Sequence, residues 1–133
     1  MTSTTSCVLL ADRHHGLRDS VRGLLETAFE SVFMVADEAS LLEGVGRLKP
    51  AMVMIDMSLS HGNVQDLIAN VTALTPDSKV LMLSVHDEPT VVKAALDAGA
   101  DALILKRCLA TDLLPAVDAL RAGERYLSPE LTP

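Results

Sequence analysis

The chain has 133 residues, of which 49% are hydrophobic, and its formal net charge at pH 7 is −7. This length is typical of one domain whose core is large enough to fold without disulfides or a structural metal. The acidic balance argues against DNA or an anionic membrane as an electrostatic partner of this chain alone. Its aromatic residues are one tyrosine and two phenylalanines, too few for a platform of base stacking.

The sequence shows no signal peptide, no paired cysteine motif for a structural metal and no membrane-spanning stretch. Cys7 and Cys108 have no spacing that matches a paired ligand motif. The first residues, MTSTTSC, lack the basic start and apolar run of a signal peptide. No apolar stretch approaches the roughly 20 residues that span a bilayer. We therefore expect a cytoplasmic protein with reduced thiols.

Five short apolar runs alternate with longer segments of helical periodicity, which is the pattern of β-α-β units around a parallel sheet. The runs are residues 7–11, 32–36, 51–55, 79–84 and 102–105. They are apolar almost throughout, as expected for strands that are covered on both faces. Gly99 and Gly123 follow two of the periodic segments, where a left-handed residue commonly ends a helix.

Five β-α units with right-handed crossovers predict an α/β three-layer sandwich, and they are too few for an eight-stranded barrel. The tail after Gly123, ERYLSPELTP, is polar and contains two prolines. We therefore predict one domain over residues 1–123 and the start of a linker over residues 124–133.

Four polar residues stand at the ends of the predicted strands, at one edge of the sheet. They are Asp12, Asp56, Ser84 and Lys106. Ligands of open doubly wound sheets bind beyond the carboxyl ends of the strands. Asp56 follows MVMI in what should be the central strand, where a carboxylate is partly desolvated unless it finds a partner. Lys106 is the candidate partner, and Ser84 could donate a hydrogen bond to a group carried by Asp56.

With these residues in place, the chain resembles the receiver domain of a two-component response regulator, and it is similar to receivers joined to a LuxR-type helix-turn-helix output domain. The matching stretches are VLLADRHHGLRDSVRGLL, MVMIDMSLS, KVLMLSVHDEPTVVKAALDAGADALILKR and AGERYLSPEL. The resemblance implies a flavodoxin-like doubly wound (βα)5 fold with a parallel five-stranded sheet in the order 2-1-3-4-5. Residues 124–133 would then lead to a possible output domain that is not part of this chain.

The resemblance also implies a function and a set of roles. Asp56 would accept a phosphoryl group from a sensor histidine kinase and so control a transcriptional output, while Ser84 and Lys106 would contact the phosphoryl oxygens. Mg²⁺ would be held by Asp12, Asp56 and the backbone carbonyl of Ser58. The chain would be a signalling module rather than an enzyme, a homodimer is expected, and DNA would be contacted only through an output domain.

Arg13 departs from this pattern, because the family normally ends its first strand on two adjacent acids, the second of which reaches the metal. Two unit charges about 6 Å apart at an effective dielectric near 20 interact by roughly 3 kcal/mol. A cation there could weaken Mg²⁺ binding by on the order of a thousandfold, unless Arg13 turns into solvent. The alternative is an atypical receiver in which Arg13 pairs with Asp56, and the chain acts as a metal-independent interaction or dimerisation module. Leu103 also stands where receivers commonly place an aromatic switch residue.

The sequence disfavours two other classes of protein. A nucleotide-binding enzyme is disfavoured because ADRHHG, after the first strand, has neither a G-x-G-x-x-G nor a P-loop pattern. DMSLS also lacks the second aspartate, two residues on, of related phosphohydrolases. A zinc site is disfavoured because the four histidines have no ligand spacing; they are His14, His15, His61 and His86.

Overall fold

The computed structural model describes residues 7–13, 15–59, 63–85 and 88–129. Its strands are β1 (Cys7–Ala11), β2 (Ser31–Val35), β3 (Met52–Asp56), β4 (Lys79–Ser84), β5 (Ala102–Leu105) and β6 (Tyr126–Leu127). Its helices are α1 (His15–Glu26), α2 (Glu38–Leu48), α3 (Val64–Leu74), α4 (Pro89–Asp97) and α5 (Leu109–Arg121), with short 3-10 turns η2 (Met57–Leu59) and η3 (Lys106–Cys108). The alternation of strands and helices is the one that the sequence predicts.

All strand pairs are parallel, and the sheet order is β2-β1-β3-β4-β5-β6. The predicted order 2-1-3-4-5 is confirmed, but the prediction of five strands is one strand short. The sixth strand lies within residues 124–133, which we expected to begin a linker. Two backbone hydrogen bonds hold this segment against β5. The N–H of Tyr126 donates to the carbonyl of Asp101, just before β5, at 3.2 Å, and the N–H of Ser128, just after β6, donates to the carbonyl of Leu103 at 3.0 Å. Two residues are too few to show a strand period in sequence.

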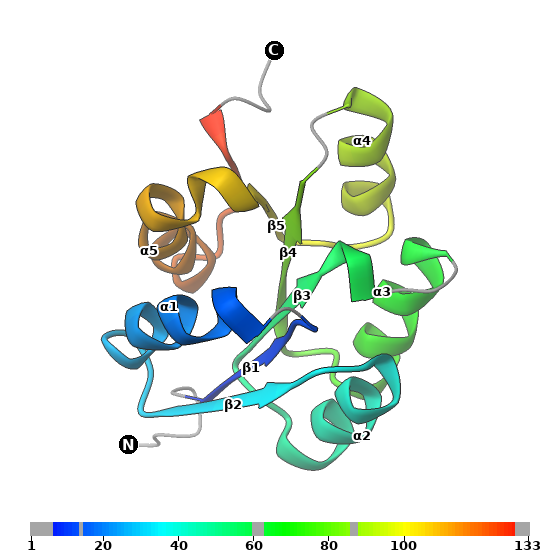
Figure 1. The fold of residues 1–133 in the computed structure, drawn as a ribbon. Helices are drawn as coiled ribbons and strands as arrows, with labels where there is room; N and C mark the ends of the chain where they lie inside the picture. Colours follow the sequence, from blue (N-terminus) through cyan, green and yellow to red (C-terminus); the bar gives the residue numbers. More distant parts are fainter. Residues whose placement is uncertain (1–6, 14, 60–62, 86–87, 130–133) are drawn as a thin grey trace.

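The helices form two layers around the sheet: α1 and α5 cover one face, and α2, α3 and α4 cover the other (Figure 1). Side chains alternate along each strand, so that Val8 and Leu10 pack with α1 and α5, whereas Leu9 and Ala11 pack with the opposite layer. The strands of the sheet centre are buried on both faces. This double burial explains why their sequences are apolar without alternation.

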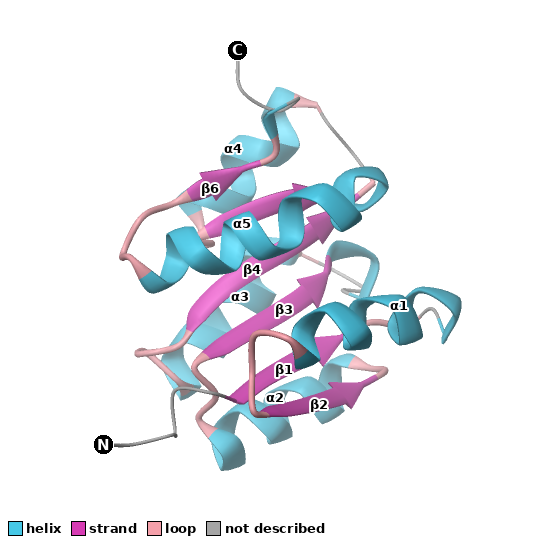
Figure 2. Ribbon diagram, turned by 90° about the vertical axis from the view of Figure 1, so that its left-hand side faces the viewer, coloured by secondary structure: helices cyan, strands magenta, loops and turns pink. Residues whose placement is uncertain are grey.

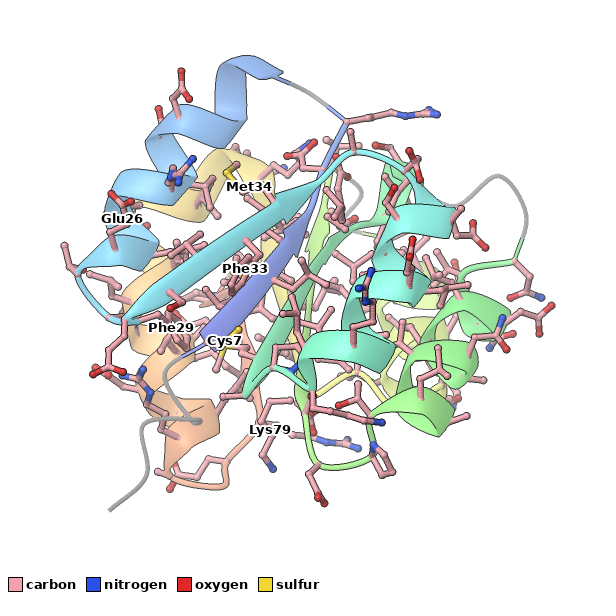
Figure 3. All side chains as sticks on the ribbon, turned by 90° about the horizontal axis from the view of Figure 1, so that it is seen from below. Cys7, Glu26, Phe29, Phe33, Met34 and Lys79 are labelled. Carbon is pink, nitrogen blue, oxygen red and sulfur yellow. The ribbon has the colours of Figure 1, made fainter. Side chains whose placement is uncertain are left out.

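The two edges of the sheet differ. β6 and α5 lie beside β5 (Figure 2). On the other side, β2 is the outermost of the described strands, and its partner among them is β1. Met34 of β2 packs against the α1/α5 core, while Phe33 has 41% of its surface exposed (Figure 3). β2 is therefore an open edge that carries an apolar side chain.

Gly99 and Gly123 adopt the positive φ angles predicted for them, +114° and +82°. A Cβ atom on Gly99 would meet only Ile68 Cγ2 at 3.9 Å, an ordinary contact. The requirement for glycine at this position is therefore conformational rather than steric.

Gly99→Ala is expected to lower the free energy of unfolding by about 1–2 kcal/mol, because an L-residue is strained at this φ. Gly23→Ala is the matched control, since Gly23 lies within α1 and a Cβ there meets no atom of the described residues within 4 Å. This second change should raise the free energy by about 0.5–1 kcal/mol through helix propensity. Urea denaturation of both variants measures the difference, and a shift of the same sign in both would contradict the assignment.

Candidate functional site

The four polar residues predicted at the strand ends come together at the carboxyl edge of the sheet. The parallel strands all point toward this edge (Figure 2). Asp56 ends β3 opposite Leu83 of β4, and Ser84 ends β4 opposite Leu105 of β5. Lys106 begins the turn η3 directly after β5. The register of three adjacent strands therefore brings the carboxylate, the hydroxyl and the ammonium to one place.

Asp56 and Lys106 form an ion pair in which Nζ donates to Oδ2 at 2.7 Å. The side chains are 2% and 13% exposed, respectively. The other carboxylate oxygen, Oδ1, accepts a hydrogen bond from the backbone N–H of Ser58 at 3.1 Å. Both oxygens of Asp56 are thus oriented by donors.

Burial acts to raise the pKa of Asp56, but the ammonium of Lys106 and the N–H of Ser58 outweigh it. The pKa of this carboxyl group therefore lies below its ordinary value. Asp56 is consequently a carboxylate at neutral pH, which is the form that can act as a nucleophile.

The carboxyl group of Asp12 lies within hydrogen-bonding range of Asp56 and has no exposed surface. A hydrogen bond between two carboxyl groups requires a proton on one of them, and a cation can take the place of that proton. Oδ2 of Asp12 is also buried, and no donor from the described part of the chain bonds to that atom.

These groups fit magnesium, which favours one or two carboxylates with the remaining positions filled by carbonyl oxygen and water. In the part of the chain that the structure describes, no cluster of three or more acidic, histidine or cysteine side chains accompanies them. Asp12 and Asp56 would therefore be the two charged ligands, and the carbonyl of Ser58 the neutral one.

Arg13 is exposed, and the cation paired with Asp56 is Lys106. The atypical alternative required the guanidinium of Arg13 to pair with Asp56, and the described structure does not favour it. Without the exposed Arg13, the formal charges of Asp12, Asp56 and Lys106 sum to −1.

Leu103 of β5 is fully buried in the core beneath α2, α3 and α4. An apolar side chain at this place cannot alternate between a buried and a solvated position as a polar-tipped ring can. Ser84 is also fully buried.

The zinc alternative is not tested by the structure. His14, His61 and His86 lie outside the described residues, and the description of His15 does not extend to its side chain.

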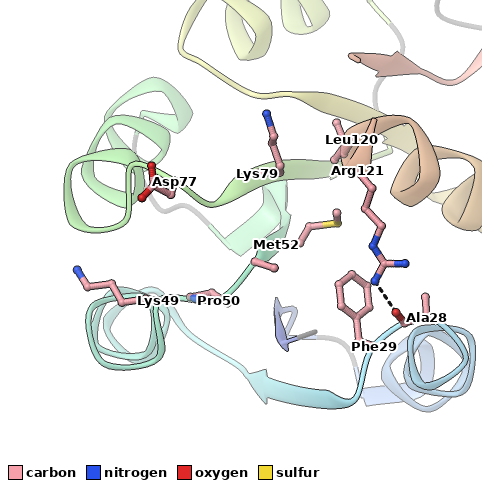
Figure 4. Close-up of a pocket in the computed structure, with 10 residues that line it drawn as sticks. Ala28, Phe29, Lys49, Pro50, Met52, Asp77, Lys79, Leu120 and Arg121 are labelled. Atoms are coloured by element: carbon pink, nitrogen blue, oxygen red, sulfur yellow. Dashed lines mark hydrogen bonds between the residues drawn. The ribbon is translucent and has the colours of Figure 1, made fainter. Parts of the chain in front are cut away.

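A groove of about 660 Å³ lies at the opposite, amino edge of the sheet. Its lining includes Phe29, Lys49 and Lys79, and the guanidinium of Arg121 lies 4.6 Å from the centre of the Phe29 ring (Figure 4). Arg121 also donates to the backbone carbonyl of Ala28. Because this groove lies at the far ends of the strands, it is separate from Asp56 and its neighbours.

Comparison with known proteins identifies the family of the chain. The profile of the response regulator receiver domain family matches residues 8–118. The transcriptional regulatory protein DegU of Brevibacillus brevis is 30% identical over 127 residues, which are 94% of this chain and 54% of DegU. The response regulator protein VraR of Staphylococcus aureus is 32% identical over 127 residues, which are 93% of this chain and 60% of VraR.

Solved structures give the same fold. A LuxR-family response regulator from Aurantimonas sp. SI85-9A1 superposes with a TM-score of 0.86 at 22% identity, covering 96% of this chain and 92% of that one. The isolated REC domain of RcsB from Salmonella enterica serovar Typhimurium, in its apo form, gives a TM-score of 0.81 at 26% identity, covering 95% of both chains.

The chain therefore belongs to the response regulator receiver domain family, in the subgroup that resembles DegU and VraR. It spans 54–60% of the length of these two relatives. Within the described residues, no helix is both long and apolar enough to cross a membrane.

Proposed function

We propose that this receiver domain accepts a phosphoryl group on Asp56 from the phosphorylated histidine of a sensor kinase. The observation that carries the proposal is the buried ion pair of Asp56 with Lys106, next to Ser84 at the end of the neighbouring strand. A carboxylate that attacks phosphorus must approach a second anion, so it needs a cation and oriented donors beside it.

In the proposed reaction, a carboxylate oxygen of Asp56 attacks the phosphorus atom of phosphohistidine. An O–P bond forms, the N–P bond breaks, and the released imidazole nitrogen takes a proton. Lys106 then turns from the carboxylate to the phosphoryl oxygens, and the hydroxyl of Ser84 donates to another of them. Bound Mg²⁺ would supply further positive charge to these oxygens.

Binding of Mg²⁺ is part of the proposal, and the local charge of −1 supports it. Arg13, although exposed, follows Asp12 directly in sequence and still opposes a divalent ion through solvent. We therefore propose that the ion binds at Asp12, Asp56 and Ser58, more weakly than at a site with two adjacent acids.

Control of transcription is proposed to lie with an output domain outside this chain, through which any contact with DNA would pass. The resemblance to DegU, a transcriptional regulatory protein, supports this part. The proposed regulator is cytoplasmic and homodimeric, and its receiver domain turns over no external substrate.

The proposal is tested by incubating the chain with acetyl phosphate and Mg²⁺ and measuring its intact mass. The wild type is expected to gain one phosphoryl group, and Asp56→Asn is expected to gain none. Asp77→Asn, at an exposed acid near the amino edge of the sheet, is the matched control and should behave like the wild type. An unmodified wild type, or equal gain in Asp56→Asn, would refute the proposal.

A further inference from the structure

A buried hydrogen-bond network joins α5 to the segment after β6. Asp112 of α5 is 7% exposed and Ser128 is fully buried. The carboxylate of Asp112 accepts a bond from Ser128 Oγ at 2.7 Å and another from the hydroxyl of Tyr126 at 3.1 Å. A carboxylate so far from solvent persists because both of its oxygens are bonded. The network is therefore a specific structure and not a chance contact.

Ser128 continues this network into the sheet. While its hydroxyl donates to Asp112, the same oxygen accepts the backbone N–H of Leu105 at 3.0 Å. The backbone N–H of Ser128 bonds to Leu103 O at 3.0 Å. Beyond the backbone hydrogen bonds between β5 and the segment of β6, the last bond is therefore made by the side-chain hydroxyl of Ser128. Because the hydroxyl of Ser128 donates to the carboxylate of Asp112, its O–H bond is polarised, and its oxygen becomes a better acceptor for the N–H of Leu105.

Leu105 is the last residue of β5 and stands directly before Lys106. In the pairing of β5 with β4, it lies opposite Ser84. On its outer side, its buried N–H is held by Ser128. A shift of this backbone would move the base of the Lys106 side chain, whose ammonium lies 2.7 Å from Oδ2 of Asp56. Ser128 belongs to the stretch AGERYLSPEL, to which the sequence assigns no role in phosphotransfer, and it is bonded to the residue directly before Lys106.

We propose that Ser128 and Asp112 are positioning residues for Lys106: they hold the carboxyl end of β5, so that the ammonium stays directed at Asp56. The connection has a second consequence. Detaching residues 126–128 from β5 would loosen Lys106, so the site and the segment after β6 are mechanically coupled. The effect on phosphorylation rests on the proposed function, whereas the positioning of Lys106 does not.

The first test measures how readily Lys106 reacts with acetic anhydride, relative to Lys93 of the same molecule, by peptide mass spectrometry. Lys93 forms an exposed ion pair with Asp97 on α4 and is an internal standard. Ser128→Ala should raise the reactivity of Lys106 at least about threefold over that standard. Asp112→Asn keeps the shape of the side chain but replaces an acceptor by a donor, and it should act in the same direction.

Two control variants separate positioning from general loss of stability. Val45→Ala opens a cavity in the core beneath α2 and should destabilise the fold without exposing Lys106. Tyr126→Phe removes one bond to Asp112 but keeps the bond from Leu105 to Ser128, so it should change the reactivity less than twofold. If Ser128→Ala resembles Val45→Ala in the relative reactivity of Lys106, the positioning role is wrong.

The second test measures the rate of phosphorylation by acetyl phosphate with Mg²⁺. Ser128→Ala should be about tenfold slower than the wild type, while Val45→Ala at the same temperature should keep its rate. Failure of the wild type to be phosphorylated would refute the proposed function but leave the lysine test intact. Equal rates in Ser128→Ala and the wild type would overturn the coupling.

Discussion

Lys106→Met should slow phosphorylation of Asp56 at least about a hundredfold, because it removes the cation that offsets charge on the phosphoryl oxygens. It should also lower the free energy of unfolding at pH 7 by about 3 kcal/mol. Loss of one partner leaves the other charge of a buried pair uncompensated, and Asp56 is only 2% exposed. Methionine fills much of the space of the lysine stem, so lost packing contributes little.

The stability difference should depend on pH with a definite sign. In the wild type the pKa of Asp56 is lowered, so the stability from its ion pair is present above the ordinary carboxyl pKa of about 3.9 and is lost as pH falls through the lowered value. Without Lys106, burial is the main influence and raises the pKa of Asp56. The variant therefore takes up a proton at higher pH, and the gap to the wild type should close on acidification.

Urea denaturation between about pH 7 and pH 3 measures this gap. Lys93→Met is the matched control, since the side chain of Lys93 is 77% exposed in its pair with Asp97. An exposed pair of this kind contributes little, so the control should change stability by less than about 1 kcal/mol. A gap for Lys106→Met that stays constant over this pH range would contradict the role assigned to the ion pair.

Arg13→Asp should strengthen Mg²⁺ binding at least tenfold, because it replaces a cation by an anion directly after Asp12. Interaction through solvent is weaker than the roughly 3 kcal/mol of a close pair, and tenfold corresponds to only about 1.4 kcal/mol. A carboxylate at residue 13 that turns inward would also add a direct ligand, which would enlarge the effect.

Isothermal titration with MgCl₂ measures this change. Arg13→Gln separates the two contributions, since it removes the positive charge without supplying an acid and should fall between the wild type and Arg13→Asp. Raised salt should reduce the advantage of Arg13→Gln, because charges at the surface are screened. Equal affinities in all three proteins would show that Arg13 does not influence the ion.

The sequence predicts the central strands and the strand-end residues because both follow from local pattern. A strand such as MVMI, which is apolar on both faces, is typical of a sheet with helices packed on both sides, and Asp56 marks its carboxyl end. The direction of Arg13 could not be predicted, since a long cationic side chain reaches either the site or solvent at similar cost.

The network of Asp112, Tyr126 and Ser128 was also missed. Polar residues beside prolines are typical of a linker, and only the return of the chain to β5 buries them. The signal that could have revealed them is the short stretch YLS, where two apolar residues interrupt a polar tail.

β2 has a consequence for how the isolated chain behaves in concentrated solution. It presents one row of backbone donors and acceptors to solvent, and no charged residue stands between Glu30 and Asp37 to repel another strand. Natural sheets commonly guard such an edge with lysine, proline or a bulge. We therefore expect aggregation in concentrated solution to begin at this strand, where Phe33 adds an exposed aromatic surface, and we expect Phe33→Lys to reduce it.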